Sequence, residues 1–138
     1  MKKGPLTFRM SGKIRFNREI HPKKDTISPG GFEIMFGRKI IPFDFEEFCG
    51  GRVDNSPSVL EFECKNPMYN DFPKLHRLKK KMFDNISDIT DFFIYTETED
   101  ETDLFPVALE ELSFTFPYDN WDTIKVPEKV LKNASFQF

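Results

Sequence analysis

The chain contains few of the residues on which recognisable chemistry usually depends. Its 138 residues include two cysteines, two histidines and one tryptophan. No apolar run approaches the roughly 20 residues that a membrane-spanning helix needs. No apolar stretch follows the basic start at Lys2 and Lys3, so we expect no secretory signal. These absences predict a single cytoplasmic domain over residues 1–138, with no membrane association and with free thiols rather than disulfides.

Motifs for cofactors, metals and catalysis are also missing. The sequence has no glycine-rich phosphate-binding loop. Zinc sites usually combine closely spaced cysteine or histidine pairs, whereas His21, Cys49, Cys64 and His76 are far apart in the chain. The sequence therefore predicts no cofactor, no metal ligand and no catalytic residue, and it favours a protein without enzymatic activity.

Phenylalanine, in contrast, is abundant. The chain has 17 of these residues, and most alternate with polar neighbours, as in Phe32/Ile34/Phe36 and Leu112/Phe114/Phe116. A period of two places such side chains on one face of a strand. We therefore expect the phenylalanines to form a core rather than a binding site.

A first hairpin is predicted near the N-terminus. A three-residue loop, Met10-Ser11-Gly12, brings Phe8 opposite Ile14 and places the glycine where such loops want a left-handed residue. The same register brings Arg9 directly opposite Lys13. This like-charge pair predicts that anionic groups lie nearby.

A second hairpin is predicted around Gly37-Arg38. With these two residues as the loop, Ile34 faces Ile41 and Phe32 faces Phe43. Glycine at the first loop position is what a type II′ turn requires.

The main helix is predicted over about residues 72–83. Leu75, Leu78 and Met82 form its apolar stripe, and Asp71 is the expected N-cap. The preceding Asn66-Pro67-Met68-Tyr69 is expected to be a turn that leads into this helix.

The remaining pattern completes an α+β fold with a largely antiparallel sheet of about six to eight strands built from hairpins, and helices on one face. A short C-terminal helix is expected to begin at Pro127 with Val130, Leu131 and Ala134 inward. Further strands are predicted at 59–64, 92–95 (as a central strand), 112–116 and 123–126.

Charge is distributed unevenly along the chain. Residues 1–40 carry a net +7, residues 73–83 hold five Lys or Arg and no acid, and residues 84–138 carry a net −10. The anions expected beside the first hairpin are Glu61 and Glu63, Asp44 and Glu46, or the phosphates or carboxylates of a partner.

Residues 97–103, here called the acidic segment, contain five acids in seven positions. Acids at this density repel one another, so we expect an exposed loop outside the sheet. Three roles are open for it: pairing with the basic helix at 74–81, attraction of a basic partner, or binding of a divalent cation. The EF-hand spacing is absent, which weighs against the last role.

The single tryptophan and a tyrosine lie together in a predicted loop at 117–121, and such residues often anchor interfaces. Combined with the acidic segment, they predict an acidic and aromatic surface that binds a basic protein partner. The predicted partner-binding residues are Glu97, Glu99, Asp100, Glu101, Asp103, Tyr118 and Trp121.

In size, net charge of −3 and lack of catalytic motifs, the chain resembles small bacterial immunity and antitoxin proteins, although no motif carries the resemblance. It implies a cytoplasmic, non-catalytic module whose acidic surface covers the basic active site of a partner. An alternative is a ligand-binding or enzymatic domain with a phenylalanine-lined pocket, closed by the loop at Gly50-Gly51 and holding Arg52 and Asp54. Nucleic-acid binding by the first hairpin is disfavoured, because its phenylalanines point away from its basic face.

Overall fold

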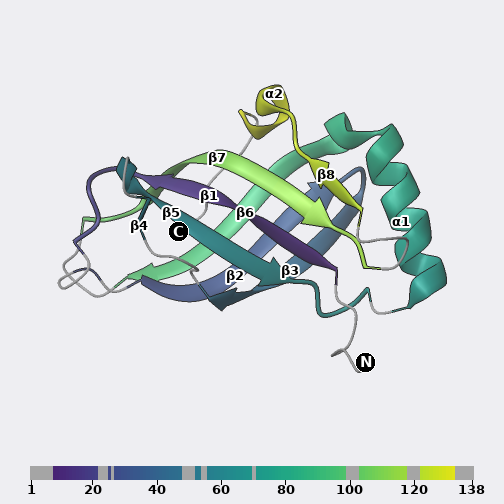
Figure 1. Cartoon of the computed structure of the whole chain (residues 1–138), viewed down its shortest axis with the longest axis horizontal. Coiled ribbons are helices and arrows are strands. Elements are labelled where there is room, and N and C mark those ends of the chain that lie inside the picture. The colour runs from purple at the N-terminus through teal and green to yellow at the C-terminus, as the bar shows by residue number, and fades with distance from the viewer. Residues whose placement is uncertain are drawn as a thin grey trace.

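The strands form one antiparallel sheet that curls around a phenylalanine core, with the main helix across one end (Figure 1). The computed structural model describes residues 8–21, 25, 27–47, 52–53, 56–69, 71–98, 103–117 and 122–132. The α+β class and the antiparallel sheet predicted from the sequence are confirmed. The elements are β1 Arg9–Phe16, β2 Ile27–Phe36, β3 Lys39–Glu47, β4 Arg52–Val53, β5 Ser56–Lys65, α1 Phe72–Asp84, the 3₁₀ turn η1 Ile86–Asp88, β6 Ile89–Thr98, β7 Pro106–Thr115, β8 Thr123–Lys125 and α2 Glu128–Leu131.

The strand order is β6-β2-β3-β5-β1-β7-β8, with β4 paired to β5 beside this path. The phenylalanines of the inner face are buried and contact one another. Phe8, for example, stacks on Phe116 at 4.6 Å between ring centroids and meets Phe43 edge-on at 5.3 Å. The expectation that they form the core is therefore confirmed.

The first predicted hairpin is wrong. Strand β1 continues through Ser11 and Gly12 and lies between β5 and β7. Arg9 and Lys13 therefore lie on the same strand and do not pair across a hairpin. The period of two runs without a break through these residues, and Gly12 occupies an inward position. A β-carbon there would lie 3.1 Å from the ring of Phe62, so the glycine provides space between strands instead of a turn.

The second predicted hairpin is confirmed in register. Ile34 pairs with Ile41 and Phe32 pairs with Phe43. Gly37 has a φ of +61°, the left-handed conformation that the primed hairpin turns need at this position.

The main helix is confirmed, and it begins and ends within one residue of its predicted bounds. The Asp71 side chain accepts a hydrogen bond from the main-chain nitrogen of Lys74, while Leu75, Leu78 and Met82 are buried. The short helix after Pro127 is also present, with Val130 and Leu131 buried; Ala134 lies outside the described residues.

The strand predicted at 92–95 exists, but its central position is wrong. It belongs to β6, which lies at one end of the strand order and pairs with β2. Phe92 is buried and Phe93 is half-buried. The apolar run is therefore continuous because the outward-facing Phe93 of this edge strand is also partly buried.

Strands β2 and β6 run the length of the curled sheet, from the end covered by α1 to the opposite end. Phe36 pairs with Ile89 at the end covered by α1, and Ile27 pairs with Thr98 at the other. Ten residues of strand span about 33 Å. The two ends therefore present separate surfaces.

Candidate functional site

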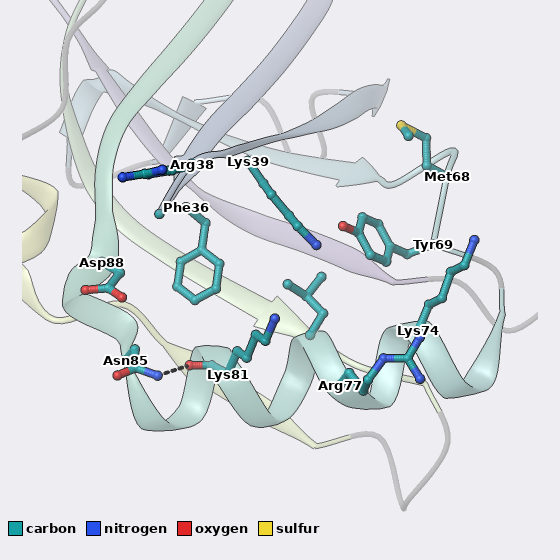
Figure 2. Close-up of a pocket in the computed structure, with 12 residues that line it drawn as sticks. Phe36, Arg38, Lys39, Met68, Tyr69, Lys74, Arg77, Lys81, Asn85 and Asp88 are labelled. Carbon is teal, nitrogen blue, oxygen red and sulfur yellow. Dashed lines mark hydrogen bonds between the residues drawn. The ribbon is translucent and has the colours of Figure 1, made fainter.

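A cavity of about 650 Å³ lies between α1 and the turn that joins β2 to β3 (Figure 2). Its wall includes the segment between β5 and α1 and the 3₁₀ turn η1. We call it the basic cavity. Its lining residues are Phe36, Gly37, Arg38, Lys39, Met68, Tyr69, Lys74, Arg77, Leu78, Lys81, Asn85 and Asp88.

One wall is fixed by the buried side chain of Asn66. Its amide oxygen accepts hydrogen bonds from the main-chain nitrogens of Met68 and Tyr69, and its amide nitrogen donates to the carbonyl oxygen of Pro42 at 2.7 Å. These bonds hold the predicted turn at 66–69 against β3. Tyr69 is thereby placed at the cavity wall.

The opposite wall is the tip of the β2–β3 hairpin. The main-chain nitrogen of Gly37 donates to the carbonyl oxygen of Asp88 at 3.0 Å, which ties the tip to η1. Lys39 continues the inward alternation of Ile41 and Phe43, because its β-strand position has the same parity. An exposed lysine thus ends the inward-facing row of this strand.

The floor of the cavity is apolar. Phe36 and Leu78 are only 7% and 5% exposed, and both line the cavity. The half-buried ring of Tyr69 meets Phe8 edge-on at 6.4 Å. The floor is therefore continuous with the phenylalanine core.

Five cationic side chains surround this floor. Lys74, Arg77 and Lys81 are three and four residues apart and so share one flank of α1, while Arg38 and Lys39 come from the hairpin. Figure 2 shows Lys39 and Lys81 extending toward each other from opposite walls, with the Tyr69 hydroxyl turned toward the space between them. Asp88 is the one acid among the described lining residues.

Within the described part of the chain, none of these five cations forms an ion pair. The neighbouring Lys79, which lies on another flank of α1, does pair with Asp122. The basic cavity therefore gathers positive charge that is not engaged in ion pairs with the described residues.

The cations of β1 are arranged differently. Arg9 binds Glu63 at 2.9 Å, Lys13 lies 3.5 Å from Glu111, and Arg15 pairs with Glu110. The anions expected near the N-terminal basic residues are thus supplied by neighbouring strands of the same sheet. Glu63 is one of the acids predicted to lie near these cations, whereas Glu110 and Glu111 of β7 are not.

Asp103, one of the predicted partner-binding residues, binds Arg18 at 2.6 Å. The same guanidinium also holds Asp25, whose side chain is 6% exposed. Hydrogen bonds from Arg18 lower the pKa of both carboxyl groups, and the main-chain nitrogen of His21 lowers that of Asp25 further. Asp103 thus has an intramolecular role that clips the start of β7 to the segment after β1.

Among the other predicted partner-binding residues, the structure describes Glu97. Glu97 belongs to β6, so the sheet extends into what was expected to be a loop. Glu99, Asp100, Glu101, Tyr118 and Trp121 lie outside the described residues.

The residues that flank the two halves of the predicted surface lie at opposite ends of the sheet. Thr98 and Asp103 border residues 99–102 of the acidic segment, which lie outside the described residues. Both are at the end of the sheet away from α1. Pro117 and Asp122 flank the aromatic loop, and Asp122 binds Lys79 of α1. The described acid that meets the basic helix is therefore Asp122 and does not belong to the acidic segment.

The predicted phenylalanine pocket is not where the cavity lies. Arg52 belongs to β4, which pairs with β5 away from α1, and Gly50, Gly51 and Asp54 lie outside the described residues. Of the phenylalanines, Phe36 lines the basic cavity. The signal that the sequence offered was the run of five cations in 73–83, together with Lys39 in an inward register.

Among the described residues, no group of three or more His, Cys, Asp or Glu side chains is placed to hold a metal ion, and Cys64 is a buried free thiol. No described helix is both long and apolar enough to cross a membrane.

Comparison with known proteins adds no relative. No family model matches the sequence, and no curated protein or solved structure is significantly similar to the chain. The function must therefore be argued from the site.

Proposed function

We propose that this protein binds a small anionic ligand in the basic cavity. The observation that supports the proposal is the set of five cations around one cavity, without an ion-pair partner among the described residues. A volume of about 650 Å³ falls within the range of small-molecule sites, roughly 300–1,000 Å³.

Electrostatics favours the entry of an anion into this cavity. Like charges gathered around a cleft repel one another, and low-dielectric walls concentrate their field inside it. An anion that enters the cavity relieves this repulsion and gains charge-assisted hydrogen bonds from lysine and arginine. The local positive field exists although the whole chain carries a net charge of −3.

The protein-binding hypothesis remains a prediction about the acidic segment and the aromatic loop. Among its described members, Asp103 is already bound by Arg18, so that side chain contributes less free charge to a partner. Nucleic-acid binding by the β1 cations is less favoured still, since Arg9, Lys13 and Arg15 pair with acids of the sheet.

Isothermal titration calorimetry with phenyl phosphate and with pyrophosphate tests the proposal. Lys81→Gln removes a cation that lines the cavity, whereas Lys80→Gln removes its neighbour on the same helix, which does not line it. We expect the Lys81 substitution to weaken binding of at least one anion about tenfold, the loss of one charge-assisted hydrogen bond, and the Lys80 substitution to change it less than twofold. Equal losses in both variants, or no binding to the wild-type protein, would refute the proposal.

A further inference from the structure

We infer that the ligand of the basic cavity is amphipathic: a phosphorylated or carboxylated molecule that carries an aromatic or aliphatic group. This inference rests on the proposed function and specifies its ligand. It follows from the division of the cavity into an apolar floor and a cationic rim.

The floor cannot be used by a purely polar anion. Phe36, Leu78 and the ring of Tyr69 offer no charge to an anionic group, so an inorganic anion that stays among the cations gains nothing from them. An apolar group of the ligand that packs on these side chains is itself removed from water. Burial of a group the size of a phenyl ring then adds at least about tenfold in affinity.

The rim fixes the direction in which such a ligand enters. Lys39 and Lys81 approach from opposite walls, and the Tyr69 hydroxyl is turned toward the space between them (Figure 2). Both ammonium groups and the hydroxyl can donate to phosphate or carboxylate oxygens. The anionic group is therefore held between the helix and the hairpin, with the apolar group below it on Leu78 and Phe36.

The backbone around the site supports a fixed pocket for this ligand. Asn66 anchors the wall that carries Tyr69, and the bond from Gly37 to Asp88 anchors the hairpin tip. Both anchors act without the cationic side chains. The charges at the rim therefore contribute to binding and not to the support of the cavity.

The test compares three probes on the wild-type protein by calorimetry: inorganic phosphate, phenyl phosphate and the neutral benzyl alcohol. We expect phenyl phosphate to bind at least tenfold more tightly than inorganic phosphate, and benzyl alcohol to bind at least tenfold more weakly than phenyl phosphate. Equal binding of the two phosphates would overturn the amphipathic ligand while leaving anion binding intact. Binding of none of them, with no response to pyrophosphate, would overturn the proposed function itself.

Two variants of α1 locate the apolar part. Leu78→Ala removes a floor residue, and Leu75→Ala removes a buried residue of the same helix that does not line the cavity. We expect the first to reduce phenyl phosphate affinity at least fivefold and to leave inorganic phosphate unchanged, and the second to change neither. Equal effects would contradict the assignment. If either variant does not fold, the comparison of the three probes still decides the question.

Discussion

Gly12 of β1 lies against the main-chain carbonyl oxygen of Glu111 in β7, and a β-carbon on this glycine would lie 2.1 Å from that oxygen. The obstacle is backbone, which cannot rotate away as a side chain can. The register of β1 against β7 also shifts just beyond this point, between Lys13 and Ile14. The close approach of two central strands therefore depends on the missing side chain.

Gly12→Ala is expected to lower the free energy of unfolding by about 3 kcal/mol, because the strands must separate to admit the methyl group. Gly37→Ala is the matched comparison. Its glycine has open space around it but a φ of +61°, so we expect a cost of about 1 kcal/mol. Urea denaturation measures both, and a larger effect at Gly37 would contradict this account of β1.

Phe8 is expected to be one of the most important core side chains. It is fully buried and contacts Phe43, Phe114, Phe116 and Tyr69. Phe8→Ala should cost about 3–5 kcal/mol through lost burial and the cavity left behind. Phe72 is 43% exposed on α1, and Phe72→Ala should cost less than about 1 kcal/mol. Similar denaturation midpoints for the two variants would argue against the packed phenylalanine core.

Removal of the Asn66 side chain should affect both stability and binding. Asn66→Ala leaves two main-chain donors and the carbonyl of Pro42 without their partner. We expect a loss of about 2 kcal/mol and weaker binding of anions, because Tyr69 is no longer held at the cavity wall. Denaturation and calorimetry on one preparation check both effects, and unchanged ligand affinity would show that the wall is positioned by other contacts.

The clip formed by Arg18 with Asp25 and Asp103 predicts a dependence of stability on pH. The pKa values of both carboxyl groups are lowered by Arg18, so their contribution is complete above about pH 4, the usual value for aspartate. It is lost as the pH falls below that value and the carboxyl groups take up protons. Asp25→Asn should therefore be less stable than the wild-type protein at pH 7, with a difference that shrinks by pH 2.5.

Thermal unfolding at several pH values measures this difference. Asp84→Asn, a substitution at the exposed end of α1, is the comparison variant, in which an aspartate outside the clip is removed. A gap between wild type and Asp25→Asn that is constant from pH 7 to pH 2.5 would contradict the role of the ionised clip.

Local patterns predicted much of the fold. The helix over 72–84 and the hairpin at Gly37 follow from periodicity, capping and a turn that needs a left-handed glycine. The error at Ser11-Gly12 arose because a turn-forming pair stood inside an unbroken alternation. What decided its role was the approach of Phe62 and Glu111, residues about 50 and 100 positions away. The edge position of β6 depends on strand order, which local sequence does not encode.

The site was harder to predict for the same reason. The cations at 73–83 were visible in the sequence, but their cavity needs Arg38 and Lys39 from a distant hairpin. Anions were expected beside the N-terminal basic residues, but two of the three acids that pair with them, Glu110 and Glu111, come from β7, which the sequence pattern did not place next to β1. Charge runs show where charge is, whereas sheet order decides which charges are neutralised.

Nuclear magnetic resonance of the ¹⁵N-labelled protein, titrated with phenyl phosphate, tests the central claim most directly. If the basic cavity binds the anion, the largest amide shifts will occur at Gly37, Lys39, Tyr69, Leu78 and Lys81, and they will saturate with one affinity. Amides of Arg18 and Asp103, at the other end of the sheet, will not move. Shifts spread over all basic surfaces without saturation, or centred away from α1, would contradict the claim.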